Sequence, residues 1–127
     1  MKQLSLFLFE IPISLNKYLN LHWAKKNEYK KYYAQLIWAT FLQVKGKNWK
    51  PFEKCEVILR YYFPTKAIHD FDNYSGKVVF DGLKQACILI DDNSKVVKKL
   101  TIEFYSPPIR EKSWTSGLQI EIIENNT

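Results

Sequence analysis

The spacing of apolar residues constrains the fold of this 127-residue chain more than any other feature. Residues 55–63 alternate between two faces, as strands do, whereas residues 23–44 repeat apolar side chains at the steps of one helical face. Strand or helical spacing recurs in four further segments: 4–10, 74–87, 97–105 and 118–124. The order strand, helix, strand, helix, strand, strand predicts a two-layer α+β domain, a mixed sheet of about four strands packed against two helices.

The same patterns predict which side chains form the core. The first strand is apolar on both faces, so we expect it to be central or covered on both sides, and residues 11–21 are expected to form a loop. The long helix should bury one stripe: Tyr33, Leu36, Ile37, Thr40, Phe41 and Val44. The second helix, starting at Tyr74 or Ser75, should bury Val79, Phe80, Leu83 and Cys87, and the last two strands Leu100, Ile102, Phe104, Leu118, Ile120 and Ile122.

Composition narrows the class of protein. The length fits one domain, residues 1–127, and the net charge of +6 fits either a nucleic-acid partner or a solvated basic surface. Cys55 and Cys87 have no metal-ligand spacing and lie among apolar residues, so we expect reduced structural thiols. No stretch is long enough to span a bilayer and none is typical of a secretion signal, so the sequence predicts a cytoplasmic protein without a membrane partner.

The five aspartates all lie between residues 70 and 92, namely Asp70, Asp72, Asp81, Asp91 and Asp92. Clustered carboxylates are the usual ligands of Mg²⁺ and also suit Mn²⁺. Each has a plainer explanation: Asp72 or Asn73 can cap the following helix, and Asp91-Asp92 can form a solvated turn. Yet two carboxylates just past a helix C-terminus oppose the helix dipole, so helix stability does not favour them and a bound metal ion could. The spacing excludes an EF-hand, and no glycine-rich phosphate loop is present.

The order of these residues resembles a known family. Asp70-Phe71-Asp72-Asn73, then Lys77, then Phe80-Asp81-Gly82-Leu83, then Asp91-Asp92 is similar to the core of the RusA family of Holliday junction resolvases. Upstream, Ser14-Leu15-Asn16 and His22-Trp23 also resemble that family, so the likeness spans most of the chain. One departure is that Lys77 lies five residues after Asp72, where the family has four. We expect the extra residue near Ser75-Gly76, ahead of the helix, since glycine tolerates such a distortion.

The resemblance implies a single RusA-like nuclease domain that cuts four-way DNA junctions by paired nicks, using Mg²⁺ and acting as a homodimer. It implies that Asp70, Asp72 and Asp92 bind the metal, that Asp91 assists, and that Lys77 stabilises charge developing on the phosphate. We therefore expect Asp70, Asp72 and Asp92 to converge, with the chain turning back after the second helix. Asp81 is expected to pair with Lys77 or to have a structural role, and His69 to be a loop residue.

The start of the long helix carries a cationic face that is our candidate for DNA-backbone contact: Lys25, Lys26, Lys30 and Lys31. Trp23, Tyr29 and Tyr32 could stack on unpaired bases or belong to the core. Two other functions remain open at this stage. One is a resolvase-like protein that binds branched DNA without cutting it; the other is a metal-dependent nuclease with a different nucleic-acid substrate.

Overall fold

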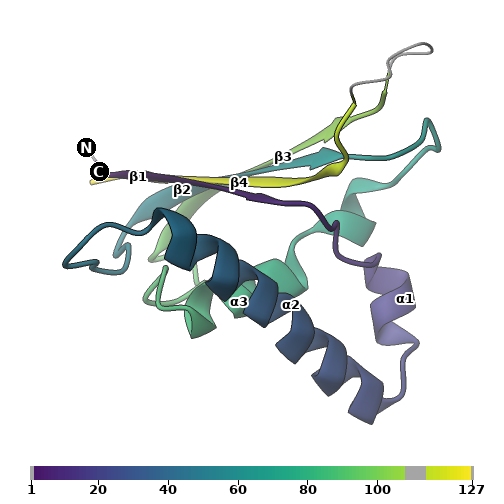
Figure 1. Cartoon of the computed structure of the whole chain (residues 1–127), viewed down its shortest axis with the longest axis horizontal. Coiled ribbons are helices and arrows are strands. Elements are labelled where there is room, and N and C mark those ends of the chain that lie inside the picture. Colours follow the sequence, from purple (N-terminus) through teal and green to yellow (C-terminus); the bar gives the residue numbers. More distant parts are fainter. Residues whose placement is uncertain (1, 108–113, 127) are drawn as a thin grey trace.

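A computed structural model describes residues 2–107 and 114–126 (Figure 1). It confirms the predicted α+β class and the order of the main elements. The elements are β1 (Gln3–Leu8), α1 (Leu15–Leu19), α2 (Trp23–Val44), β2 (Cys55–Tyr62), the 3₁₀ helix η1 (Phe71–Tyr74), α3 (Lys77–Gln85), β3 (Val97–Tyr105) and β4 (Gly117–Glu124). Part of the connection between β3 and β4, predicted to be a polar link, lies outside the described residues.

The four strands form one mixed sheet in the order β1-β4-β2-β3. The β1–β4 and β4–β2 pairs are antiparallel, whereas β2 and β3 are parallel. Two parallel neighbours need a long crossover, and here η1 and α3 provide it. The crossover leads the chain from the end of β2 back to the start of β3, so α3 runs antiparallel to both strands (Figure 1).

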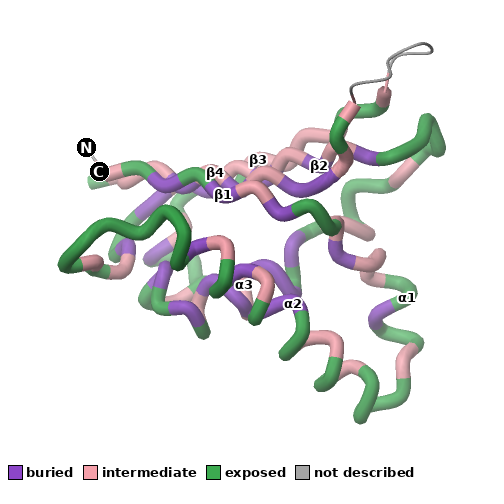
Figure 2. Tube along the Cα trace, viewed as in Figure 1, coloured by how far each residue is buried: buried purple, intermediate pink, exposed green. Residues whose placement is uncertain are grey.

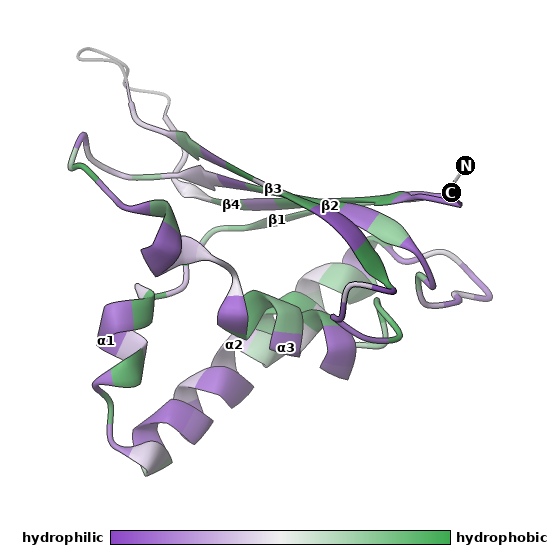
Figure 3. Cartoon of the chain, turned by 180° about the vertical axis from the view of Figure 1, so that it is seen from behind, coloured by the Kyte–Doolittle hydropathy of each residue, from purple (hydrophilic) through white to green (hydrophobic). Residues whose placement is uncertain are grey.

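Helices α2 and α3 cover one face of the sheet, and the core lies between the two layers (Figure 2). Gly82 lets the helices approach closely, because a Cβ at that position would lie 2.5 Å from Ile37 Cδ1. At the far end of β1, the buried Tyr33 hydroxyl donates to the Glu10 carbonyl over 2.8 Å and fixes α2 to the strand. The N-terminal half of α2 extends past the sheet and is mostly hydrophilic (Figure 3).

The predicted position of the first strand is wrong. β1 lies at an edge of the sheet, and its residues alternate between buried and exposed rather than being covered on both sides. The second apolar face is explained by an aromatic group on the open side of the sheet, where Phe7 contacts Phe9 and Tyr62 at ring-centroid distances of 5.1 and 6.2 Å. Phe9 remains 78% exposed.

Other differences are local. Residues 11–21 contain α1, a five-residue helix whose N-cap is Ser14. The second helix starts at Lys77, later than predicted, and Cys87 is exposed beyond its end. Other side chains expected in the core are less covered than predicted: Val44 and Leu100 are exposed, and Leu36, Thr40, Phe80, Ile102 and Phe104 are partly buried. Cys55 is buried as predicted, and burial raises the pKa of its thiol to about 11.

Among the described residues, no helix is both long enough and apolar enough to cross a bilayer.

Candidate functional site

Asp70 and Asp72 follow the loop after β2. Asp70 is the extended residue that precedes η1, and Asp72 lies within this 3₁₀ turn. Both are exposed, and within the described chain neither carboxylate has a hydrogen-bond or ion-pair partner. Asp70 is in extended backbone and Asp72 is not, so the two side chains do not share one face as they would in a strand. The plainer explanation, that Asp72 or Asn73 caps the following helix, does not hold, since α3 begins after Gly76 without a side-chain cap.

Aromatic packing holds this acidic segment against the ends of β2 and β3. Phe71 stacks on Phe104 with ring centroids 4.2 Å apart, and His69 stacks on Phe63 at 3.8 Å. Asn73 accepts a hydrogen bond from the Asn16 amide, so it ties η1 to α1 rather than capping α3. His69 therefore serves packing, and the two aspartates are presented to solvent between anchored neighbours.

Gly76 allows the turn from η1 into α3. Its φ of +94° is left-handed, and a Cβ there would lie 2.8 Å from Leu59 Cδ1, so only glycine fits without strain. Ser75 and Gly76 thus precede the helix. That the residue extra to the family pattern lies here stays a prediction. Lys77 is the first residue of α3 and is exposed. A cation at a helix N-terminus opposes the helix dipole, so helix stability does not account for this lysine.

Asp91 and Asp92 lie beyond the other end of α3. The Lys84 ammonium is 3.8 Å from Asp91 Oδ1 and 3.5 Å from Asp92 Oδ1. The Asp92 backbone N–H donates to Asp91 Oδ1 over 2.8 Å and, with help from Lys84 and Asn93, lowers the pKa of Asp91. Lys84, in the last turn of α3, therefore compensates this pair in place of the metal ion that the sequence suggested.

The two acidic pairs lie at opposite ends of the crossover. Leu89 bridges to Phe52, just ahead of β2, and the Val97 amide donates to the Asn93 carbonyl, so Asp91-Asp92 lies beside the starts of β2 and β3. Asp70 lies beside their ends, and β3 spans roughly 25 Å at about 3.3 Å per residue. We call these regions the Asp70 end and the Asp91 end.

The predicted convergence of Asp70, Asp72 and Asp92 is not found within one chain. Among residues 2–107 and 114–126, no group of three or more His, Cys, Asp or Glu side chains is placed to hold a metal ion. The reason is the parallel pairing of β2 and β3, which makes the crossover separate the residues before it from those after it. Asp81 is 3.4 Å from Lys30 across the α2–α3 contact, and within the described chain it forms no ion pair with Lys77, which was one of the two expectations for it.

The predicted cationic face is only partly available. Lys30 pairs with Asp81, and Lys25 pairs with Glu28 at 3.4 Å. Lys26 and Lys31 have no acidic partner within the described chain. This part of α2 is the hydrophilic segment that extends past the sheet (Figure 3).

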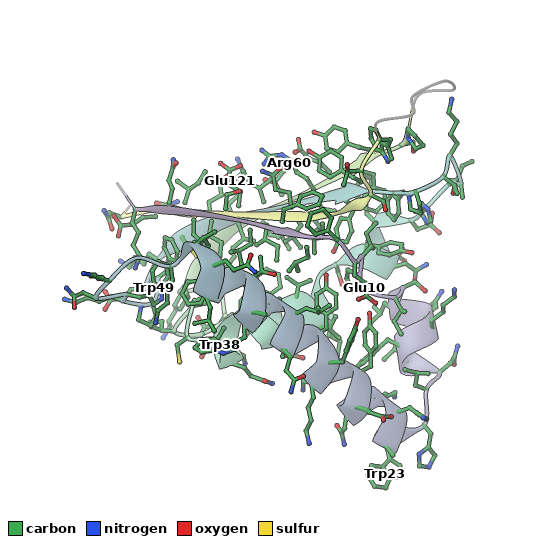
Figure 4. The ribbon with its side chains drawn as sticks, in the orientation of Figure 1. Glu10, Trp23, Trp38, Trp49, Arg60 and Glu121 are labelled. Carbon is green, nitrogen blue, oxygen red and sulfur yellow. The ribbon has the colours of Figure 1, made fainter. Side chains whose placement is uncertain are left out.

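The three aromatic residues named for base stacking differ in exposure. Trp23, at the tip of α2, is 69% exposed (Figure 4). Tyr29 accepts a hydrogen bond from the Ile13 amide and is partly buried, so it belongs to the packing of the molecule. Tyr32 is exposed, and its hydroxyl donates to the Glu10 carboxylate. Trp23 is thus the freest of the three for contact with a base.

The open face of the sheet offers no surplus positive charge at its centre. Arg60 donates from Nε to Glu103 over 2.7 Å and from Nη1 to Glu121 over 2.5 Å (Figure 4). The hydrogen bond to Glu121, with that to Glu103, raises the pKa of Arg60. This face is therefore a poor surface for a phosphate backbone.

Sequence reasoning missed a second group of lysines, in the loop between α2 and β2. Lys47, Lys50 and Lys54 line an open hollow at the Asp91 end. The signal that could have found them is their density, since residues 45–54 contain four lysines, but the segment was interpreted only as a helix break.

Searches against protein-family models and against curated protein sequences return no match to this chain. The family resemblance therefore rests on the order and spacing of residues alone, chiefly those from Asp70 to Asp92 and also Ser14-Leu15-Asn16 and His22-Trp23.

Proposed function

We propose that this protein is a metal-dependent endonuclease of the RusA type, which resolves four-way DNA junctions as a homodimer. The observation that carries the proposal is the state of the Asp70 end. Asp70 and Asp72 are exposed carboxylates without partners in the described chain, and Lys77 stands at a helix start where it is electrostatically unfavourable. Local folding explains none of the three, whereas phosphodiester chemistry uses both residue types.

The carboxylate oxygens suit Mg²⁺ or Mn²⁺ by ligand type. Their arrangement within one chain does not, because each end contributes only two neighbouring aspartates. We therefore assign no reaction step to a metal. The roles left to this chain are electrostatic: Lys77 would stabilise negative charge that develops on the scissile phosphate, and lysines elsewhere would bind the backbone.

Because the Asp70 end and the Asp91 end are separated within one subunit, a homodimer could bring them together. A second copy related by a two-fold axis could place its Asp91 end beside the Asp70 end of the first copy. Two such composite sites would also match the two-fold symmetry of a four-way junction. Action on DNA would place the protein in the cytoplasm, as the sequence predicts.

A non-cleaving protein that binds branched DNA is the second candidate. It is favoured by the Lys84 ion pairs, which already compensate Asp91 and Asp92 without a metal. It would use the same lysines and would need neither Lys77 nor the free carboxylates of the Asp70 end.

The first test is incubation with a synthetic four-way junction and MgCl₂, beside a linear duplex of equal length and an EDTA control. Symmetrical paired nicks on the junction alone are the expected result. Tight junction binding without nicks would support the second candidate, and equal cutting of both DNAs would indicate a less selective nuclease.

Mixing two inactive variants tests the composite site. A heterodimer of Asp70→Asn and Asp92→Asn subunits keeps one intact site if the ends combine between subunits, and none if each subunit forms its own site. We expect the mixture to regain single nicks that neither variant makes alone. Continued inactivity, with subunit exchange verified by native mass spectrometry, would contradict the composite site.

A further inference from the structure

A hollow at the Asp91 end has a volume of about 800 Å³. Its walls come from the loop between α2 and β2, the start of the chain and the end of β4, and include Lys2, Lys47, Trp49, Lys50, Lys54 and Glu124. Trp49 marks its position at the end of the molecule where the two termini lie (Figures 1 and 4). The Trp49 Nε1–H donates to the Cys87 carbonyl over 3.0 Å, which joins the hollow to the segment leading to Asp91.

The hollow carries positive charge that its surroundings do not neutralise. Lys47, Lys50 and Lys54 are exposed, and none has an ion-pair partner within the described chain. Glu53 and Glu124 are the acidic residues in the lining, so the lysines outnumber them. At the start of α2, by contrast, two of the four lysines are already paired with acids.

The floor of the hollow consists of side chains that pack against one another. The Lys2 ammonium lies 4.4 Å from the centre of the Trp49 ring and 4.5 Å from that of Phe52, and it also donates to the Lys50 carbonyl. Trp49 packs edge-on against Phe41 and Phe52 at 5.0 and 5.6 Å. These contacts stabilise the conformation of the loop that carries the exposed lysines Lys47, Lys50 and Lys54.

We propose that this lysine hollow, defined by Lys47, Lys50 and Lys54, binds successive phosphates of a nucleic-acid backbone. Its polar, open lining differs from the mostly apolar pockets that hold small molecules. Lysines that displace condensed counterions from a polyanion give affinity without sequence preference. A concave surface suits a rod-like backbone, whereas a membrane presents a flat one. The inference rests on the nucleic-acid partner of the proposed function, but not on cleavage.

The test measures binding in EDTA, so that cleavage plays no part. Fluorescein-labelled four-way junction and linear duplex are titrated with the protein at several KCl concentrations. The triple variant Lys47→Ala/Lys50→Ala/Lys54→Ala is compared with Lys17→Ala/Lys66→Ala/Lys98→Ala, which loses the same charge from exposed lysines outside the hollow.

We expect the hollow variant to bind about 10- to 100-fold more weakly near 0.1 M salt, with a salt slope lower by about 2 to 3. The control variant should keep its salt slope and lose no more than about threefold in affinity, because only general attraction is reduced. Equal losses in the two variants would overturn the inference and leave the proposed function standing.

Footprinting on the wild-type protein gives a second measurement that needs no variant to fold. Bound duplex should protect Lys47, Lys50 and Lys54 from acetylation while Lys17 and Lys66 react as before. Cleavage of the junction without this protection would overturn the inference alone. Protection without cleavage would support the phosphate-binding role of the lysine hollow and would contradict the proposed nuclease activity. Binding to vesicles of anionic lipid but to neither DNA, or to none of these probes, would overturn both.

Discussion

The Asp70 end and the Asp91 end carry the same residue types in different states. Each has two aspartates and a lysine from α3: Lys77 from its first turn and Lys84 from its last. At the Asp91 end the lysine lies within 4 Å of both carboxylates and stabilises them. At the Asp70 end Lys77 pairs with no acidic side chain of the described chain, and both carboxylates remain free.

The charges of the Asp91 end are explained by the stability of the fold, whereas those of the Asp70 end are not. Lys84 near a helix C-terminus is favourable with the helix dipole and compensates the turn that follows. Lys77 near the N-terminus is unfavourable, so its presence needs another reason. We therefore expect Lys77 and the free carboxylates of the Asp70 end to act most directly on the phosphate. The Asp91 end would contribute Asp92 to the composite site and would bind the backbone through the lysine hollow.

Asp70→Asn should have the largest effect. We expect junction cleavage to fall by at least about 100-fold, because the substitution removes a charge that no local partner replaces. Junction binding should be unchanged or tighter, since repulsion of phosphate is reduced. Cleavage is followed on denaturing gels and binding by fluorescence anisotropy in EDTA.

Asp81→Asn is the matched control. It removes an aspartate of α3 whose carboxylate is already paired with Lys30, so cleavage should stay within a few-fold of wild type. Wild-type cleavage by Asp70→Asn would remove the Asp70 end from the reaction.

Lys77→Ala should lower cleavage by about 10- to 1000-fold with little change in junction affinity. That result is the signature of an interaction made mainly in the transition state. Lys84→Ala provides the comparison from the other end of α3 and should reduce cleavage less. If the two variants behave alike, the distinction between the ends does not extend to catalysis.

The lysines at the start of α2 allow a graded test. Lys26→Ala/Lys31→Ala should lower the salt slope of junction binding by about 2, because neither ammonium has an acidic partner in the described chain. Lys25→Ala/Lys30→Ala should lower it less, since those lysines are already paired with Glu28 and Asp81. Equal slopes for the two double variants would show that the ion pairs open when DNA binds.

The smallest expected effect is on the titration of Asp91 in Lys84→Ala. The pKa of Asp91 is lowered first by the Asp92 N–H and further by Lys84, so removing the lysine should raise it, which an NMR titration can follow. A lowered pKa stabilises the fold above the pKa of the unfolded chain, and this contribution is lost as pH falls through the folded value. Wild type and variant should therefore differ in thermal stability near neutral pH and converge in acid. An unchanged Asp91 titration would mean that the backbone N–H alone sets its pKa.

Strand and helix periodicity predicted much of the fold. Residues 97–105 match β3, and α2 has the predicted bounds, because their apolar spacing reflects one buried face. β1 was misplaced because Phe7 and Phe9 suggested a second covered face, whereas they pack with each other at an open edge. Residue pattern alone does not distinguish aromatic packing on a surface from burial in a core.

The arrangement of the candidate site was harder to predict because it depends on strand pairing. A helix between two strands places Asp70 and Asp92 together only if those strands do not pair in parallel. The sequence left the pairing of residues 55–63 with 97–105 undecided, and the parallel choice moves Asp92 to the opposite end of the sheet. The lysine hollow was missed for a similar reason, since Lys2 and Lys54 line one surface only in the folded chain.

The parallel crossover also makes the molecule a spacer of fixed length. β3 runs continuously over roughly 25 Å, whereas Lys77 and Lys84 of the two ends are about 10 Å apart along the axis of α3. At about 3.4 Å per step, these lengths correspond to about three to seven nucleotides along one strand of a duplex. A mononucleotide is therefore shorter than the interval between the two ends of a given subunit. Only a polymer longer than this interval can contact both ends of one subunit at once. The fold therefore sets a minimum length for a ligand that binds both ends.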